Sequence, residues 1–216
     1  MFPVIADNLD AFVRGYLTTV LLTVAGMTGA LVIGTAVASA RVWGGALISG
    51  IAGFYVEFFR NTPLLVQIFF YSTLFAPANL GITRDPVIVA IVALAIYTGA
   101  FATEAIRAGI LSVDPGQVEA ARSLGLGMVA TLRLVVLPQA IRTVIPPLGS
   151  IASALVRNSA IASAISAREL LFVGLLVSQR TFSLEPLLGI LVGYWSLTIP
   201  LAFAVNYLER RLAFSR

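Results

Sequence analysis

The chain has 216 residues, of which 59% are hydrophobic and only 11% are charged, and its mean hydropathy is +0.97. A water-soluble domain of this size cannot bury so much apolar surface, so lipid must be the solvent for much of the chain. All 14 basic residues are arginine, and the sequence contains no histidine and no cysteine. The arginines form no stripe that would bind nucleic acid, so we expect no nucleic-acid partner.

The missing residue types exclude several kinds of site. Without lysine there is no Walker-type phosphate loop and no Schiff base. Without histidine or cysteine there is no usual zinc or haem site, no Ser-His-Asp triad and no thiol nucleophile. Among enzymes, the composition is compatible only with a membrane enzyme whose catalytic groups are carboxylates. We therefore expect no catalytic site, metal or cofactor on this chain, and ATP, if used, must bind to another subunit.

Hydropathy predicts an all-α integral membrane protein with five spans of roughly 20 residues. We read the whole of 1–216 as one transmembrane domain. The start of the chain shows no basic region and no cleavage site, so the first span is the predicted insertion signal. The expected spans cover about 16–40, 63–75, 86–111, 141–165 and 187–208.

The second of these spans follows a predicted break. The apolar region from Gly45 to Ala76 is too long for a single crossing at about 1.5 Å per residue. Asn61-Thr62-Pro63 should interrupt it, because proline removes a backbone donor and disfavours helix at the residue before it. We expect an interfacial helix up to Arg60 and a span from about Pro63 to Phe75.

The distribution of arginines predicts the orientation. With the N-terminus outside, eight arginines lie on the inner side and four on the outer side, leaving aside the ambiguous Arg60 and Arg157. The positive-inside rule therefore predicts an outer N-terminus and an inner C-terminus. The inner set is Arg41, Arg107, Arg122, Arg133, Arg142, Arg210, Arg211 and Arg216, and the outer set is Arg14, Arg84, Arg168 and Arg180.

The loop at about 112–138 would then face the cytoplasm and should contain a short helix. Asp114-Pro115 is typical of a helix start, and Gly125 suits the helix end. A segment from Met128 to Leu137 is amphipathic and should end at Pro138, where the next span begins. The short helix offers a small apolar strip of Ala120, Ala121 and Leu124, with Glu119 and Arg122 beside it. Such a strip fits a docking groove, although a helix lying on the membrane surface is equally compatible with these residues.

The same loop resembles the signature loop of ABC-importer permeases. That signature reads Glu119-Ala120-Ala121, three residues, Gly125, nine residues, a β-branched residue, any residue and Leu137-Pro138; Val135 stands where isoleucine is more usual. Further segments resemble motifs of the permeases for polar amino acids, in the same order, so the resemblance extends from about Gly15 onward. They are 59–67, with Asn61 where glycine is common, 97–110, 157–159 and 208–212.

The resemblance implies a type I importer permease fold in a bacterial plasma membrane. It also implies four kinds of partner: a second permease, identical or similar, a dimer of ABC ATPase subunits that binds ATP and magnesium, an extracytoplasmic solute-binding protein, and membrane lipid. In that family the loop helix enters a cleft on the ATPase. The contact would consist of Glu119, Ala120, Ala121, Arg122, Leu124 and Gly125.

Polar side chains inside the spans are costly and point to the solute path or to structural pairs. Glu104 and Arg107, three residues apart, are expected to form a structural ion pair. Tyr97 lies nearer the middle of its span and is a path candidate. Arg157 and Asn158 either face the path, where the arginine would meet a carboxylate, or serve packing. The remaining path candidates are Thr62 and Gln67.

An arginine–asparagine pair favours glutamate, glutamine or a related polar amino acid over a cationic one. Two other classes of function stay open at this point. A self-contained secondary transporter would use Glu104 as a proton or ion relay, and the absence of internal repeats and the docking helix argue against it. A membrane scaffold would dock a soluble protein and transport nothing.

Overall fold

The computed structural model describes residues 3–212, which form helices and connecting loops without a β-strand. Arg216, which the charge count places on the inner side, lies outside the described residues. In chain order the elements are α1 (Pro3–Asp7), α2 (Leu9–Trp43), α3 (Gly45–Asn61), α4 (Leu64–Phe75), α5 (Pro86–Leu111), α6 (Pro115–Ser123), α7 (Met128–Thr131), the π-helical turn η1 (Leu132–Val136), α8 (Leu137–Asn158), the 3-10 helix η2 (Ser159–Ile165), α9 (Leu170–Thr181) and α10 (Glu185–Leu212).

Four helical runs of the described chain are long and apolar enough to cross a membrane: α2, α5, Met128–Ile165 and α10. The expected second span is α4, whose 12 residues extend about 18 Å at 1.5 Å per residue. α5 has the bounds predicted from sequence. Its start is capped as an Asp-Pro sequence predicts, because the Asp85 carboxylate accepts a hydrogen bond of 2.8 Å from the Val87 amide.

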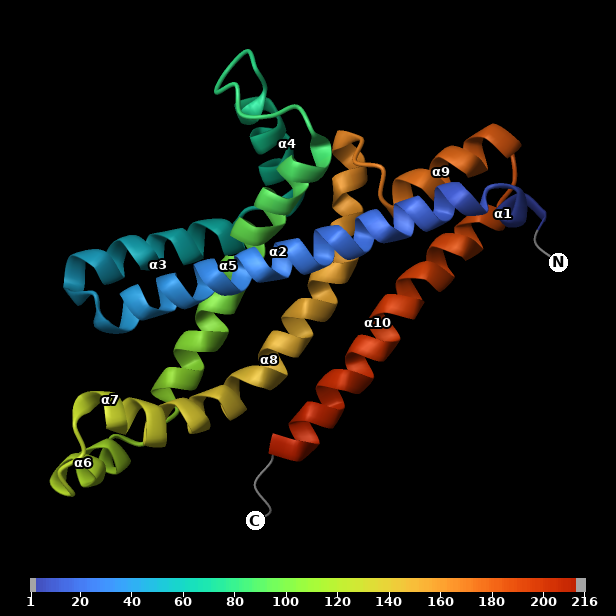
Figure 1. The fold of residues 1–216 in the computed structure, drawn as a ribbon. Helices are drawn as coiled ribbons and strands as arrows, with labels where there is room; N and C mark the ends of the chain where they lie inside the picture. Colours follow the sequence, from blue (N-terminus) through green and yellow to red (C-terminus); the bar gives the residue numbers. More distant parts are fainter. Residues whose placement is uncertain (1–2, 213–216) are drawn as a thin grey trace.

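The predicted break between α3 and α4 is confirmed. Thr62 and Pro63 are extended, with ψ of 137° and 132°, so the helix ends at Asn61 and a new one begins at Leu64. α3 turns back along α2 and also contacts α5 (Figure 1).

The expected helix boundary at Pro138 is wrong. The chain stays helical from Met128 through Asn158, and Pro138 occupies the first turn of α8, directly after the π-helical turn η1. The wider winding of a π turn relieves the clash between a proline ring and the carbonyl one turn earlier. The segment from Met128 to Val136 and the fourth span are thereby parts of one continuous helix.

Small residues let α2 lie close against α5 along much of its length. Gly26, Ala30, Gly34 and Ala38 recur every four residues on the buried face of α2. A Cβ atom at Gly34 would lie 2.8 Å from the Ala102 Cβ, nearer than such atoms approach. In a membrane, where the hydrophobic effect does not drive helices together, close approach of this kind supplies much of the packing energy.

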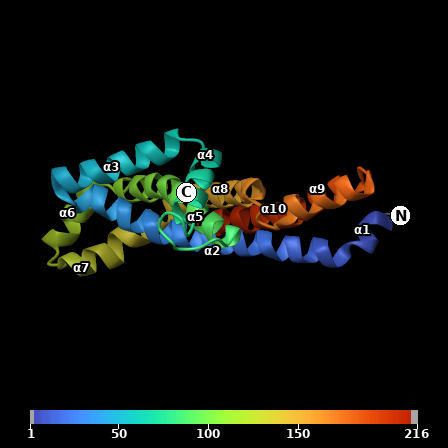
Figure 2. The same cartoon turned by 90° about the horizontal axis from the view of Figure 1, so that it is seen from above.

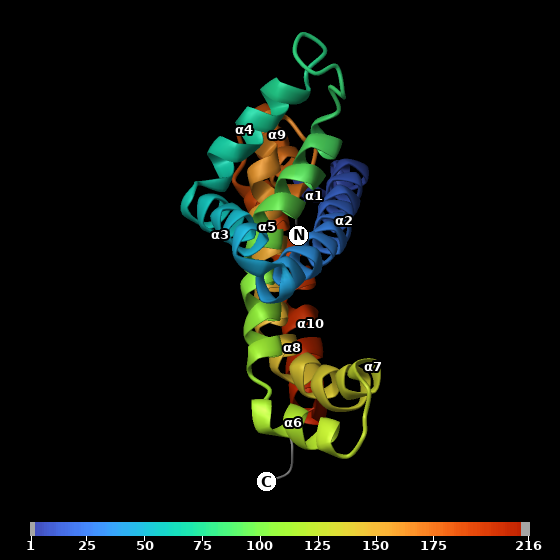
Figure 3. The ribbon, with the colours of Figure 1, turned by 90° about the vertical axis from the view of Figure 1, so that its left-hand side faces the viewer.

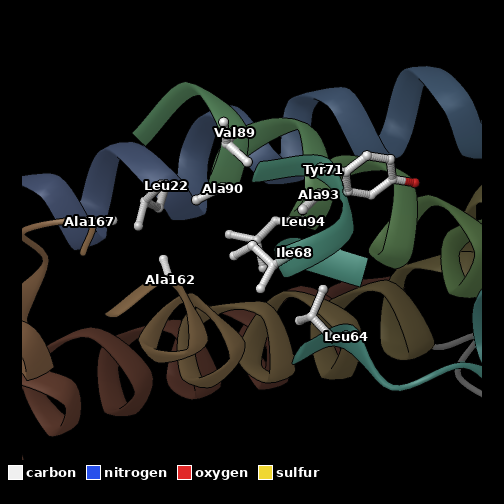
Figure 4. Packing of buried hydrophobic residues seen from close by; sticks show 10 residues of the cluster. All are labelled: Leu22, Leu64, Ile68, Tyr71, Val89, Ala90, Ala93, Leu94, Ala162 and Ala167. Carbon is white, nitrogen blue, oxygen red and sulfur yellow. The ribbon is translucent and has the colours of Figure 1, made fainter. Parts of the chain in front are cut away.

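The main apolar core lies where α2, α4, α5 and the 3-10 helix meet. Leu22, Ile68 and Leu94 are its largest fully buried side chains, and Ala90 and Ala162 fill the space between them (Figure 4). Seen from above, the helices form an elongated and flat arrangement (Figure 2). The α4–α5 loop lies at one end of the molecule, and α6 and α7 lie at the other (Figure 3).

Candidate functional site: a loop helix and a cavity between α5 and α8

The loop helix α6 is delimited by its own sequence. The Asp114 carboxylate accepts a hydrogen bond of 2.7 Å from the Gly116 amide and so satisfies a free donor at the helix start. At the other end Gly125 adopts a φ of +84°, which L residues rarely reach, and the Leu126 amide donates to the Ala121 carbonyl at 3.1 Å. The predicted start and stop of this helix are confirmed.

Two of the three residues in the expected apolar strip face outward. Ala120 and Leu124 are exposed, Leu124 to 84%, and Glu119 is exposed beside them. Ala121 is only 5% exposed, so the expectation that it belongs to the outer strip needs correction. Its side chain packs against the same chain and positions the helix instead.

A pair of amide side chains ties α6 to α8. Gln139 donates a hydrogen bond of 2.5 Å from Nε2 to the Oε1 atom of Gln117, and a second of 2.9 Å to the Val135 carbonyl. Nearby, the Ser112 hydroxyl at the end of α5 donates to the Thr143 hydroxyl of α8 at 3.2 Å. The loop helix is therefore fixed to α5 by three residues of chain and to α8 by the Gln139–Gln117 hydrogen bond.

Glu104 and Arg107 form an ion pair within α5, with 3.0 Å between Oε2 and the guanidinium nitrogen. The other carboxylate oxygen of Glu104 pairs with Arg41 from the last turn of α2. The sequence predicts Arg41 only as one of the arginines on the inner side. Its partner lies 63 residues away, and no local pattern indicates that α2 and α5 bring the two together.

Tyr97 and Asn158, both path candidates, line one small cavity between α5 and α8. Its volume is about 120 Å³, and its other walls are Thr98, Phe101, Ile151 and Ala154. The Arg60 guanidinium lies 5.2 Å from the centre of the Phe101 ring, within the range of a cation–π contact. An aromatic pair, an amide and a nearby cation are thus gathered on one side of the molecule.

The other path candidates lie elsewhere. Gln67 is buried and donates from Nε2 to the Thr62 hydroxyl at 3.0 Å and to the Thr62 and Phe59 carbonyls at 3.1 Å. These bonds connect α4 to the end of α3 across the break at Thr62-Pro63. Arg157 is exposed, and it does not line the cavity that contains Asn158.

One buried carboxylate belongs to no site predicted from the sequence. Glu169, fully buried at the start of α9, accepts hydrogen bonds from the Leu171 and Phe172 amides at 2.9 and 2.7 Å and from the Tyr194 hydroxyl at 2.7 Å. An acidic residue directly before an apolar run is typical of a helix start and indicates α9, which hydropathy alone did not predict. Glu169 therefore joins α9 to α10.

Known protein sequences resemble this chain along nearly its whole length. The profile of the family described as "Binding-protein-dependent transport system inner membrane component" matches residues 30–214. The "Probable glutamine ABC transporter permease protein GlnM" of Bacillus subtilis (strain 168) is 41% identical over 210 residues, which cover 97% of this chain and 96% of that protein. The "Glutamine transport system permease protein GlnP" of Escherichia coli (strain K12) is 33% identical over 205 residues, covering 94% of each chain.

Solved structures share the fold. A crystal structure described as "an amino acid ABC transporter with histidines" superposes with a TM-score of 0.85, at 32% sequence identity over 98% of both chains. The fold also matches an inward-facing conformation of the MetNI methionine ABC transporter, with a TM-score of 0.79 at 23% identity, over 95% of this chain and 98% of that one. The loop residues, the fold and the full-length similarity agree: the chain belongs to the family of binding-protein-dependent transport system inner membrane components.

Proposed function

We propose that the chain is the transmembrane permease subunit of an ATP-driven ABC importer for polar amino acids, with glutamine or glutamate as the solute. Relatives that match over more than nine-tenths of the chain are described as glutamine and glutamate permeases. The polar side chains of the cavity support a polar solute. The chain performs no chemistry in this function.

The observation that carries the proposal is the exposed face of α6 at one end of the molecule. Glu119, Ala120 and Leu124 have no cover there, and Leu124 is a large apolar side chain. An apolar side chain beside a charged one suits a groove on a soluble partner. In our proposal that partner is the ABC ATPase dimer, which binds ATP and magnesium, and α6 lies in the cytoplasm of a bacterial cell with the N-terminus outside its plasma membrane.

The same two helices that hold α6 also bound the cavity. Motion of the ATPase subunits would move α6, and α6 would move α5 through the connection at Ser112–Asp114 and α8 through the Gln117–Gln139 bond. The spacing of α5 and α8 would then change around Tyr97 and Asn158. Rigid-body motion of packed helices is a common route to alternating access. A second permease and an extracytoplasmic binding protein complete the proposed assembly.

The cavity is smaller than the roughly 300–1,000 Å³ of ordinary ligand sites. We therefore propose that the cavity forms one wall of a solute path and that the second permease completes this path. In this arrangement Asn158 and Tyr97 would meet the polar part of the solute, and Arg60 would attract a carboxylate.

Charge reversal at Glu119 tests the proposal. The variant Glu119→Lys, co-expressed with the cognate ATPase and reconstituted with the binding protein, should lose co-purification of the ATPase and ATP-dependent uptake of labelled glutamine. Asp10→Lys, an exposed charge reversal near the opposite end of α2, should keep the ATPase bound. If Glu119→Lys retains both the ATPase and uptake, α6 is not the docking element.

The alternatives predict different outcomes in the same vesicles. A secondary transporter would take up glutamine without any ATPase and would stop when the proton gradient is collapsed. A scaffold would bind the ATPase and move no solute under any condition. Glu104, the proposed relay of a secondary transporter, is held by Arg41 and Arg107 on both carboxylate oxygens, which favours a structural role.

A further inference from the structure

A groove runs behind α6 and continues along the spanning helices. Its first part, about 420 Å³, lies between α6, α7 and the ends of α2 and α5, and its second part, about 430 Å³, continues between α2 and α8. Both parts fall within the range of ligand sites. Four residues line both parts and make the groove continuous: Trp43, Ile110, Leu132 and Val136.

The groove has one cation, at its α6 end. Arg122 lines the first part together with Val118 and Met128, and no acidic side chain of the described residues pairs with it. In the second part the groove passes Leu31, Thr35 and Ser39 of the spanning helix α2 and carries no charged residue. Trp43, 56% exposed, lies where the two parts join, and tryptophan is enriched at membrane interfaces.

We propose that this groove binds an anionic phospholipid of the surrounding membrane, with the phosphate at Arg122 and an acyl chain along α2 and α8. A long apolar channel inside the span with an unpaired guanidinium at its interfacial end matches a lipid in both shape and charge. Basic pockets at the ends of spanning helices recognise acidic lipid headgroups in this way. The lipid would lie between the loop helix and the spanning helices and would brace α6 from behind.

The two tryptophans of the chain provide the measurement. Replacing Trp195, which lies on α10, by phenylalanine leaves Trp43 as the only tryptophan reporter in the groove. The purified permease, without any ATPase, is reconstituted in phosphatidylcholine with a small fraction of lipid brominated on the acyl chain, either phosphatidylglycerol or phosphatidylcholine. We expect brominated phosphatidylglycerol to associate more strongly by roughly five-fold, as one nearby basic residue would give.

Variants of two arginines distinguish a specific lipid site from general electrostatic attraction of acidic lipids to the protein. Arg122→Gln should abolish the preference for phosphatidylglycerol, whereas Arg133→Gln should retain it, because Arg133 is an exposed residue of the same region that lines neither part of the groove. Val136→Phe, which fills the junction of the two parts, should reduce quenching by both brominated lipids. Excess inorganic phosphate should leave quenching unchanged, since the proposed ligand needs its acyl chain.

Three results would overturn the proposal. The two brominated lipids could quench Trp43 equally, or Arg122→Gln and Arg133→Gln could reduce the preference for phosphatidylglycerol to the same degree. In the third result, neither lipid quenches Trp43, because protein covers the groove. Gel filtration of each variant verifies that the fold is intact. The measurement involves neither ATP nor uptake, so failure of the lipid site would leave the proposed transport function untouched, and the reverse also holds.

Discussion

Gln139 of α8 donates a hydrogen bond to Gln117 of the loop helix, with 2.5 Å between the two amide groups. It is the side-chain link through which movement of α6 would reach the fourth span directly. A helix of nine residues is marginal without tertiary contacts, so this bond also holds α6 in place.

Removing either amide should weaken the coupling between ATP hydrolysis and uptake. We expect Gln117→Ala, Gln139→Ala and the double variant to lower the solute moved per ATP to a similar degree, about two- to ten-fold for one lost hydrogen bond. Uptake and phosphate release in proteoliposomes give this ratio. Ser123→Ala is the matched control, since its hydroxyl bonds only within α6. Additive losses in the double variant would show that the two amides act separately.

Neutralising Glu104 should cost more stability than neutralising Arg107. Glu104→Gln leaves the guanidinium groups of Arg41 and Arg107 without a carboxylate between them, whereas Arg107→Gln retains the Arg41 pair. The side chains are 23–32% exposed, so the difference should be about 1 kcal/mol or less. Thermal unfolding in detergent measures it. Equal melting temperatures for the two variants would mean that Arg41 contributes nothing.

Glu169 should be important for stability although it lies far from the loop helix. Glu169→Ala leaves two backbone amides and the Tyr194 hydroxyl without their buried acceptor, which should cost about 1–3 kcal/mol for each group that stays unpaired. Glu169→Gln retains an acceptor and should lose less. Tyr194→Phe removes one donor together with its need for a partner, so it should be mildest. Unfolding curves that follow any other order would contradict this account of α9.

A side chain at Gly34 should separate α2 from α5. Gly34→Val places atoms where Ala102 already lies, and overpacking of this kind costs about 1–3 kcal/mol. Gly50→Val introduces the same side chain in α3, where a Cβ meets nothing within 4 Å. The melting temperature in detergent should fall for the first variant and stay near that of the parent for the second. A fall of equal size in both would show that valine itself, rather than crowding, is responsible.

Features that depend on a few neighbouring residues could be predicted from the sequence. The starts at Asp85-Pro86 and Asp114-Pro115, the stop at Gly125 and the break at Thr62-Pro63 each follow from a local backbone or capping preference. Hydropathy located the long spans because membrane helices are continuous apolar runs. It placed the start of the first span at Tyr16, whereas α2 begins at Leu9, because a helix can extend beyond its apolar segment.

Features that depend on tertiary contacts could not be predicted in this way. Arg41 meets Glu104 only because α2 and α5 pack together, and Tyr97 meets Asn158 only because α5 lies against α8. Ala121 points inward because of how α6 packs on the rest of the chain. The sequence of α6 alone does not predict that packing. The predicted boundary at Pro138 is wrong because the effect of a proline depends on whether the preceding turn is α or π. The orientation in the membrane, with the N-terminus outside, stays a prediction from charge.

The continuous helix from Met128 to Asn158 has a mechanical consequence. Its first residues adjoin the loop helix and its last residue lines the cavity, so a tilt at one end moves the other in the opposite direction about the α2 and α5 contacts between them. Two places in this helix can bend: the π turn at Leu132–Val136, and Pro146-Pro147 inside α8, where each proline removes a backbone hydrogen bond. Bending at either place would reduce how much of a tilt imposed at the loop helix reaches the cavity, so the stiffness of this one helix would limit how far the cavity responds.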